Sequence, residues 1–278
     1  MNNMKQSLTP LQITLLEMLK WFDGFCKENN LRYYAIGGTT LGAMRHQGFI
    51  PWDDDIDVGM PRRDFEKLKE FSKNQNGRYR FETYDSEADD YCYAFNKLYD
   101  TTTTLIEHKR VDVVRGVYID IFPLDGIGNT KDEGLDNYNK FKRLNQLFET
   151  SVNGVRKGRS FYKNAAVFLF KMIPGFILNQ RALRIKMNAI CSKYDFDECK
   201  YGGNFFGAYW EKEIVELSLF GKPTYYKFED MMIACPEDSD GYLTCIYNDW
   251  RKLPPVEKQV SHHDFVYLNL QESYLKNK

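Results

Sequence analysis

Residues 33–63 read YYAIGGTTLGAMRHQGFIPWDDDIDVGMPRR, and this stretch decides how the rest of the chain is interpreted. Four aspartates fall within five positions of it: Asp53, Asp54, Asp55 and Asp57. In an extended strand side chains alternate, so Asp53, Asp55 and Asp57 are predicted on one face. Like charges on one face repel unless a cation lies among them, and Mg²⁺ prefers such carboxylates together with substrate phosphates. The stretch predicts a metal site, with a solvated acidic turn as the alternative.

A glycine turn precedes the aspartates by about fifteen residues. Residues 33–36 are predicted to form a short strand that leads into a helix beginning at Gly37, Gly38 and Thr39. Glycines let backbone N–H groups approach an anion closely, and a helix N-terminus adds a favourable partial charge. Arg45 and His46 stand between the turn and the aspartates, where Arg45 can bind a phosphate. The combination predicts a site for a metal ion and a phosphate group.

The pattern GG-T-x-LG-A-x-RH-x-GFIPWDDDIDV-x-M-x-R-x-D-F resembles the LicD family, the phosphocholine transferases related to the fukutin-type sugar-phosphate transferases. The resemblance implies an α+β fold, a nucleotidyltransferase-like mixed sheet with flanking helices and a helical insertion. It implies three parts: a catalytic core over residues 1–130, the helical insertion over 131–200, and a β-ribbon with a C-terminal helix and loop over 201–278 that completes the site.

The composition is that of an ordinary globular protein. Of 278 residues, 43% are hydrophobic and 28% charged, and the formal net charge of −1 gives no basic footprint for nucleic acid. The chain does not begin with a basic segment followed by an apolar run, so no secretory signal is predicted. The six cysteines have no zinc-site spacing and are expected to be reduced and mostly packed. We expect a cytoplasmic protein, with the inner face of the membrane as the second location.

Local signals predict most of the first hundred residues. Thr9, Pro10 and Gln12 form a capping box and helix start, and apolar residues then recur at helical spacing to Cys26. A second helix is predicted over Arg62–Ser72. Aromatic and Thr-rich runs predict strands over 79–84, 91–99 and 101–107. Lys97 and Thr103 stand where the family has a basic residue and a Thr, which implies contact with the nucleotide. An exposed strand Lys is the alternative for Lys97.

Residues 116–126, GVYIDIFPLDG, resemble the family segment IDIFPLDG. Tyr118, Asp120 and Phe122 are predicted to share one strand face. An Asp among apolar side chains is costly to bury unpaired, so Asp120 is the predicted third metal ligand, with a capping or salt-bridged Asp as the alternative. Asp125 is predicted to serve a turn before Gly126.

The region 132–195 is predicted to be helical, with a break around 153–160 and a stop at Pro174-Gly175. Charged residues and Pro174 interrupt the apolar run 161–178 too often for a membrane span. A buried helix pair is the favoured interpretation. The second is peripheral membrane contact, because aromatic and Lys residues alternate there.

Two further family elements follow. Residues 201–236 contain a Gly-Asn-x-x-Gly-Ala-Tyr-like segment and a predicted β-ribbon that carries Phe228-Glu229. Gly202 and Gly203 permit either close backbone approach to a ligand or a simple bend, and Lys212 is either a phosphate contact or solvated. Residues 238–262 resemble the family ending YGDYM-x-LPP…H. Asn248 replaces the usual Gly and tolerates a left-handed conformation, and Trp250, which replaces Tyr, is predicted to stack on a base or ring.

The resemblance implies a role for each candidate residue. The predicted ligands of one or two Mg²⁺ (or Mn²⁺) ions, which bridge the pyrophosphate of the donor, are Asp55, Asp57 and Asp120. The predicted phosphate- and substrate-binding residues are Gly37, Gly38, Thr39, Arg45, Lys97 and Trp250. Asp53 or a metal-bound carboxylate is the predicted acceptor of the proton from the attacking hydroxyl, and His46 is the second candidate.

The implied donor is CDP-choline or another CDP-alcohol, and the acceptor is a hydroxyl of a glycan or teichoic acid. CMP is the second product. A nucleotidyltransferase that adds NMP from an NTP to a sugar phosphate or other small acceptor is the alternative, and a non-catalytic glycan- or nucleotide-binding module is the third. A choline pocket would need aromatic faces around the cation. With 19 Tyr, 20 Phe and 4 Trp, the sequence offers too many candidates to name the pocket residues, and it does not identify the head group.

Overall fold

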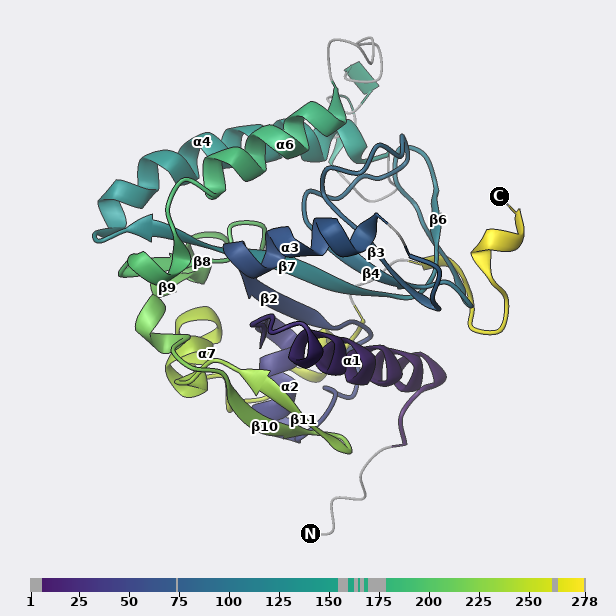
Figure 1. The fold of residues 1–278 in the computed structure, drawn as a ribbon, viewed down its shortest axis with the longest axis horizontal. Coiled ribbons are helices and arrows are strands. Elements are labelled where there is room, and N and C mark those ends of the chain that lie inside the picture. Colours follow the sequence, from purple (N-terminus) through teal and green to yellow (C-terminus); the bar gives the residue numbers. More distant parts are fainter. Residues whose placement is uncertain are drawn as a thin grey trace.

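The computed structural model describes residues 7–73, 75–154, 160–162, 165, 168–169, 179–261 and 265–277. Its central sheet has the strand order β1-β2-β7-β4-β3, and β8 and β9 extend it from β7 (Figure 1). These strands are β1 (Tyr34–Ala35), β2 (Asp57–Pro61), β3 (Tyr79–Glu82), β4 (Asn96–Asp100), β7 (Tyr118–Gly128), β8 (Tyr201–Gly203) and β9 (Ile214–Glu216). Strands β2 and β7 are parallel, whereas β4 pairs with β7 in the antiparallel sense. The sheet is therefore mixed.

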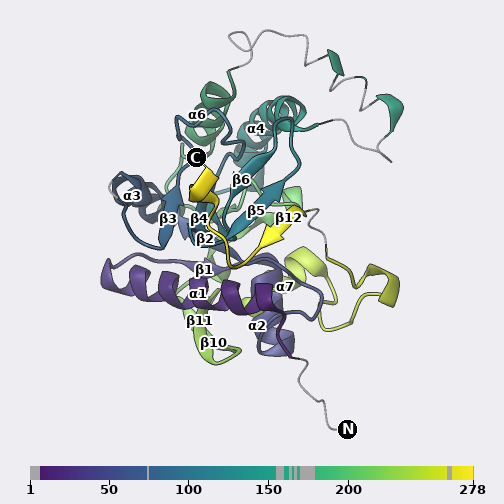
Figure 2. The same cartoon turned by 90° about the vertical axis from the view of Figure 1, so that its right-hand side faces the viewer.

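Helices lie on opposite sides of these strands (Figures 1 and 2). On one side lie α4 (Lys131–Val152) and α6 (Gln180–Cys191), and on the other lie α1 (Pro10–Glu28), α2 (Gly37–His46) and α7 (Ser239–Tyr247). Helix α3 (Arg62–Ser72) contacts β2, β3 and β7. Helices and a mixed sheet in one chain confirm the predicted α+β class.

Two smaller sheets and five short 3₁₀ helices complete the described fold. One sheet has the order β12-β5-β6, with β5 (Thr104–Glu107), β6 (Val113–Arg115) and β12 (Phe265–Asn269). The other is a ribbon of β10 (Thr224–Phe228) and β11 (Met231–Cys235). The short helices are η1 (Phe196–Glu198), η2 (Trp210–Glu213), η3 (Leu217–Leu219), η4 (Val256–Lys258) and η5 (Tyr274–Asn277).

The capping box of α1 is confirmed, and it also serves the acidic loop. The Gln12 amide donates to the Thr9 hydroxyl at 3.2 Å, and the Thr9 amide donates to the Gln12 side chain at 3.0 Å. The side-chain amide of Gln12 also donates to the Asp53 carbonyl at 2.9 Å. The start of α1 therefore fixes the backbone of the loop that carries the first aspartates.

The β-ribbon that carries Phe228-Glu229 is confirmed, and its turn supports the same loop. The Glu229 carboxylate accepts the Phe49 amide at 3.0 Å. A Cβ on Gly48 would lie 1.8 Å from that carboxylate, so a larger residue there would displace Glu229 from the Phe49 amide. The Phe49 and Phe228 rings pack edge-on with centroids 4.9 Å apart. The ribbon therefore positions residues 48–50, which lead into the aspartates.

The strand predicted through the aspartates is wrong in extent, because β2 begins only at Asp57. Residues 53–55 lie in a loop after a turn at Pro51-Trp52, in which the Asp53 amide donates to the Ile50 carbonyl at 2.9 Å. The partner β1 has two residues and pairs no farther back than Val58. The three residues therefore lack a strand partner on that side.

Two other predicted strands are shorter than expected. The strand predicted over 91–99 begins at Asn96, since the chain before it turns and the Tyr91 hydroxyl donates to the Phe95 carbonyl at 2.6 Å. The strand predicted over 101–107 begins at Thr104. Before it, Asp100 accepts the Thr102 amide at 2.9 Å, which makes residues 100–103 a turn.

The turn predicted at Asp125 is wrong. Strand β7 continues to Gly128, because β8 pairs with its second half and Gly202 lies opposite Gly126. Asp125 is fully buried and accepts two hydrogen bonds from Arg62, at 2.7 Å from Nε and 2.6 Å from Nη2. Gly202 and Gly203 lie in a strand, and a Cβ on Gly202 would meet the Asp125 carbonyl oxygen at 2.3 Å. The close backbone approach that these glycines permit is therefore to a neighbouring strand of the sheet.

The middle of the chain is helical where it is described. Helices α4 and α6 confirm the helical prediction, and α4 ends at Val152, where the break was expected. The predicted stop at Pro174-Gly175 and most of 161–178 lie outside the described residues, so both interpretations of that run stay predictions. No helix in the described ranges is long and apolar enough to cross a membrane. The division into parts at 130 and 200 also stays a prediction.

The buried Arg62–Asp125 pair predicts that removal of one partner destabilises the protein far more than replacement of both. Asp125→Asn removes one charge and leaves the buried Arg62 with only the half-buried Glu66, 3.0 Å away, as a carboxylate partner among the described residues, so we expect a loss of about 3–5 kcal/mol in the free energy of unfolding. The double variant Arg62→Met/Asp125→Leu removes both charges and should lose far less. Urea unfolding at neutral pH measures both.

The matched control is Lys73→Met, which breaks the exposed Lys73–Glu70 pair of α3 and should leave stability nearly unchanged. A double variant as unstable as Asp125→Asn would show that the pair itself, rather than the relief of an unpaired charge, holds β7 to α3.

Candidate active site

The parallel pairing of β2 and β7 places two carboxylates side by side. Asp57 lies opposite Asp120 in the strand register, and the Asp120 amide donates to the Ile56 carbonyl at 3.0 Å. Asp57 is half-buried and Asp120 is buried. Burial raises the pKa of Asp57 well above its usual value, and the charges of Asp55, Asp120 and Asp53 raise it further. The site therefore concentrates negative charge that a cation would relieve.

The loop before β2 forms the tighter cluster. Asp53, Asp54 and Asp55 are half-buried, and each places one carboxylate oxygen within 4.8 Å of the others. Asp54 also accepts a hydrogen bond from the Ser261 hydroxyl. The predicted ligands Asp55, Asp57 and Asp120 thus bridge this loop and the strand pair. Hard carboxylate oxygens at this density are a suitable donor set for Mg²⁺ or Mn²⁺.

Lys97 lies against the aspartates from the next strand. It stands opposite Asp120 in the register of β4, and its ammonium nitrogen is 2.6 Å from Asp120 Oδ1. The same nitrogen lies 3.3 Å from the Tyr118 ring centroid and 4.0 Å from that of Tyr93. Burial raises the pKa of Asp120, while Lys97 opposes that rise. Lys97 is 1% exposed, so the alternative of a solvated strand Lys is wrong.

The glycine turn packs against the aspartates. The Thr39 hydroxyl accepts the Asp57 amide at 2.9 Å, and the Gly37 amide donates to the Tyr242 hydroxyl at 3.1 Å. Gly37 has a φ of +53°, which favours glycine. A Cβ on Gly38 would lie 3.0 Å from Asp53 Oδ2. The turn thus positions the carboxylates beside the N-terminus of α2, and its contact with a phosphate stays a prediction.

Arg45 and His46 lie at the other end of α2. Arg45 donates from Nη1 to the Trp250 carbonyl at 2.9 Å and from Nε to His46 Nε2 at 3.0 Å. Burial lowers the pKa of both side chains, and the charge of Arg45 lowers that of His46 further. Because His46 Nε2 accepts from a cation, that nitrogen is poorly placed to take a proton from a substrate. In the described part of the chain, no carboxylate pairs with Arg45.

A cleft of about 560 Å³ opens beside Asp53 and Gly38. Four aromatic side chains line it, namely Trp52, Tyr209, Tyr247 and Trp250. The Tyr209 and Tyr247 rings pack edge-on, 4.9 Å apart. The Trp250 indole N–H donates to Asp240 at 2.9 Å, and the Arg251 guanidinium covers its ring at 4.4 Å. Trp250 is thus a fixed wall of the cleft, and its predicted stacking on a ligand stays a prediction.

Three further candidates are Lys212, Asn248 and His262. Lys212 lines a separate hollow with Glu211 and Glu216. Asn248 has a positive φ of +59°, but its ψ of −110° lies outside the left-handed helical region, so only the sign of φ agrees with the expectation. His262 lies outside the described residues.

Sequence reasoning missed Glu213, which lies beneath the cleft. Glu213 is 5% exposed and accepts the Tyr209 amide at 3.0 Å, so it fixes the loop that presents Tyr209. Burial raises its pKa to about 7. Its charge also raises the pKa of Asp57. No signal marked it, because it follows Glu211 and Lys212 in a run that reads as solvated. Trp52, Tyr209 and Tyr247 were equally hidden among many aromatics.

Comparison with known proteins matches part of this chain to a family. A family model described as LicD/FKTN/FKRP, nucleotidyltransferase domain, matches residues 30–154, which hold the glycine turn and all the predicted metal ligands. Residues 30–154 are a domain of the LicD/FKTN/FKRP family. The predicted resemblance is confirmed.

Similarity to individual proteins extends beyond that domain. The chain is 27% identical over 274 residues to the lipopolysaccharide cholinephosphotransferase LicD of Haemophilus influenzae. The aligned region covers 98% of this chain and 99% of that protein. It is 25% identical over 122 residues to the human ribitol 5-phosphate transferase FKRP, and this aligned region covers 44% of this chain and 23% of FKRP. The prediction of a LicD-like phosphotransferase enzyme is confirmed.

Glu213 predicts a pH-dependent stability of the LicD-type fold. Its pKa rises from 4.5 to about 7 on folding, so the folded state binds more protons between these values. Stability should therefore fall as pH rises from about 4.5 through about 7, by roughly 3 kcal/mol in all. Glu213→Gln keeps the shape without the charge and should lack this fall.

Urea unfolding of both proteins from pH 5 to 8.5, with a chelator present, measures the difference. The gap in favour of Glu213→Gln should widen with pH. Curves that stay parallel across this range would contradict the assignment.

Proposed function

We propose that this protein transfers phosphocholine, or a related phospho-alcohol, from a CDP-alcohol to a hydroxyl of a cell-surface glycan or teichoic acid, and releases CMP. The observation that carries the proposal is the cluster of carboxylates around Asp57 and Asp120 beside an aromatic cleft that also contains Arg45. The Haemophilus influenzae relative, a lipopolysaccharide cholinephosphotransferase matched along nearly its whole length, supports the same chemistry.

The carboxylates fit a divalent cation. Asp55, Asp57 and Asp120 would hold Mg²⁺ or Mn²⁺, because their crowded charges raise the pKa of Asp57 and Asp120 unless a cation offsets them. When bound, the metal supplies positive charge that neutralises the donor's pyrophosphate. The nucleotidyltransferase-like character of the fold belongs to the same proposal and rests on the description of the matching family.

The side chains of the cleft bind and orient the donor. Arg45, which has no carboxylate partner in the described chain, binds a phosphate oxygen. The faces of Trp52 and Tyr247 receive either the cytosine ring or the quaternary ammonium of choline, which aromatic rings attract. Glu213 keeps Tyr209 at the mouth through its bond to the backbone amide.

Transfer then needs one bond formed, one broken and one proton moved. The acceptor's hydroxyl oxygen bonds to the phosphorus that carries the alcohol, and the bond from that phosphorus to the CMP oxygen breaks. A carboxylate of the cluster takes the hydroxyl proton: Asp53, which lines the cleft beside Gly38, or one of the predicted metal ligands such as Asp120. His46 is the weaker candidate, since its Nε2 accepts a hydrogen bond from Arg45.

A nucleotidyltransferase reaction is the second candidate, favoured by the description of the matching domain. It would place NMP from an NTP on a sugar phosphate or other small acceptor and release pyrophosphate. The released molecule therefore separates the two reactions.

The proposal predicts CMP as the released product and a strict need for Asp57. Pure protein with Mg²⁺ and an acceptor glycan extract should release CMP from CDP-choline, detected by mass spectrometry. Asp57→Asn or a chelator should reduce the rate by at least about 1,000-fold, because transfer relies on charge at this site.

The matched control is Asp136→Asn, an exposed Asp of α4, which should keep full activity. Circular dichroism should show that Asp57→Asn remains folded. Substantial CMP release by Asp57→Asn would contradict the metal site, and pyrophosphate release from CTP instead would establish the alternative reaction.

The aromatic cleft predicts discrimination between donor head groups. Trp52→Leu should raise the KM for CDP-choline about 10-fold, or about 1.4 kcal/mol, because it removes a ring face from the cation. The KM for the uncharged head group of CDP-glycerol should change less than about 3-fold. An equal rise for both donors would assign Trp52 to the cytosine ring.

A further inference from the structure

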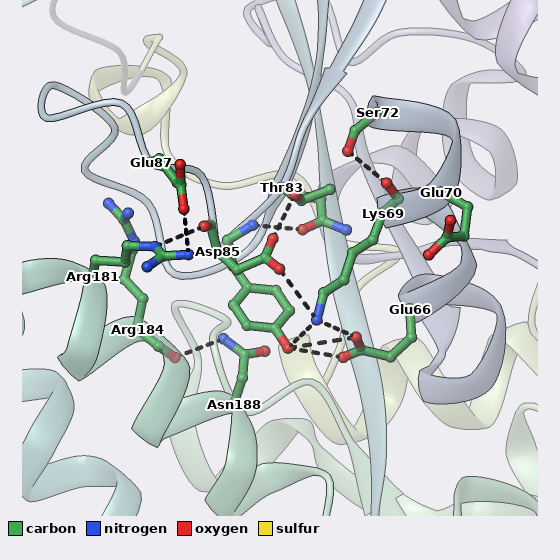
Figure 3. Close-up of polar contacts among 12 residues, drawn as sticks. Glu66, Lys69, Glu70, Ser72, Thr83, Asp85, Glu87, Arg181, Arg184 and Asn188 are labelled. Carbon is green, nitrogen blue, oxygen red and sulfur yellow. Dashed lines mark hydrogen bonds and ion pairs between the residues drawn. The ribbon is translucent and has the colours of Figure 1, made fainter. Parts of the chain in front are cut away.

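A second hollow, of about 490 Å³, lies between the start of α6, the loop 86–92 and residues 109–111. Two arginines one turn apart on α6, Arg181 and Arg184, line it (Figure 3). The aromatic cleft shares none of these residues. None of these residues has a role in the proposed reaction.

Arg184 is a buried cation without a counter-charge. It is 2% exposed, and its guanidinium donates from Nη2 to the Ser86 carbonyl at 2.7 Å and lies over the Tyr91 ring, 5.2 Å from the ring centroid. Its Nε is buried without a hydrogen-bond partner. In the described ranges no carboxylate pairs with it, and the Glu82 carboxylate, which acts on it electrostatically, is bound by Arg115 at 2.8 Å. Burial therefore lowers the pKa of Arg184. Such a cation is costly unless an anion joins it.

The rest of the lining adds positive charge. Lys109 and Arg110 are half-buried on the opposite wall. Arg181 reaches out to Glu87 at 3.2 Å, an exposed pair that contributes little against solvent (Figure 3). Three acidic residues also line the hollow: Glu87 and Asp89, which are exposed, and Asp90, which is bound by both Nη atoms of Arg115 at 2.7 Å each. The interior of the hollow therefore favours an anion.

The hollow adjoins a smaller space that reaches Asp120. This smaller space, of about 240 Å³, is lined by Asp120, Lys97 and Phe206, and it shares Cys92 and Lys109 with the Arg184 hollow. Asp120 therefore faces one space and Asp53 faces the aromatic cleft. A molecule that enters from the Arg184 side approaches the carboxylates on a different side from the donor.

We propose that the Arg184 hollow binds an anionic group, a phosphate or a carboxylate, of the acceptor glycan and directs the acceptor's hydroxyl toward Asp120. This inference rests on the proposed function. The planar guanidinium fork of arginine matches either oxyanion with two parallel hydrogen bonds, and the Nε left unpartnered here is one of the donors.

The first experiment measures binding of inorganic phosphate and needs no enzymatic activity. Phosphate, compared with chloride at equal ionic strength, should raise the thermal midpoint of the wild type and of Lys186→Met, which removes an exposed charge from the same helix. Arg184→Met should lose the part of this rise that comes from the hollow, while Arg45→Met removes only the donor-site contact and should keep that part. A rise that is undiminished in Arg184→Met, or no rise in the wild type, would overturn the proposal.

Arg184→Met should keep its own midpoint without phosphate, because replacement of an unpaired buried charge by an apolar chain is seldom destabilising. Where this variant does not fold, Arg184→Lys replaces it. That change keeps the charge but removes the fork, and it should weaken phosphate binding at least about 3-fold. Unchanged phosphate binding in Arg184→Lys would overturn the proposal.

The second experiment is kinetic and separates the acceptor from the donor. Arg184→Met should raise the KM for the acceptor about 10-fold or more and leave the KM for CDP-choline unchanged. Phosphatase treatment of the acceptor should abolish the difference between variant and wild type if the anion is a phosphate, and reduction of its carboxylates should do so if it is a carboxylate. Equal loss for donor and acceptor would contradict the assignment. An inactive wild type that still binds phosphate through Arg184 would refute the proposed function alone.

Discussion

The parallel pairing of β2 with β7 is the constraint on which the site depends. It places Asp57 beside Asp120 within the sheet, where burial makes two negative charges expensive. The fold answers with fixed positive charge: the Lys97 ammonium at Asp120 and the N-terminus of α2 beside Asp57, where a Cβ on Gly37 would lie 3.8 Å from Oδ2. These offsets are partial, since the pKa of both aspartates remains raised. The unbalanced remainder is the physical basis for the divalent cation that we propose.

Three distant elements hold the acidic loop through its backbone. Gln12 of α1 binds the Asp53 carbonyl, Thr39 of α2 binds the Asp57 amide, and Glu229 of the ribbon binds the Phe49 amide. Each bond satisfies a polar group that the loop cannot pair within a sheet. The Phe228-Glu229 and glycine motifs of the sequence therefore serve to position the aspartates.

Sequence reasoning succeeded where the signal is local. The capping box of α1, the helix over Arg62–Ser72 and the strand face of Asp120 follow from neighbours within four positions, and all are present. It failed where a partner distant in sequence decides the outcome. Asp125 lies in a strand because β8 pairs there, and Glu213 is buried because its own loop folds over it. Charged residues look solvated in sequence until the fold supplies their partner.

In the proposed reaction, the placement of the arginines follows from the charges of the two substrates. A CDP-alcohol would bring a pyrophosphate that the aspartates repel, so the donor cleft would need a cation that no carboxylate in the described chain binds. Arg45 meets that need, whereas Lys97 does not, because Asp120 holds it. An acceptor entering past Asp120 meets the same repulsion on the other side. Arg184 is the buried cation there without a carboxylate among the described residues, so the two arginines divide the recognition of two anions across one acidic centre.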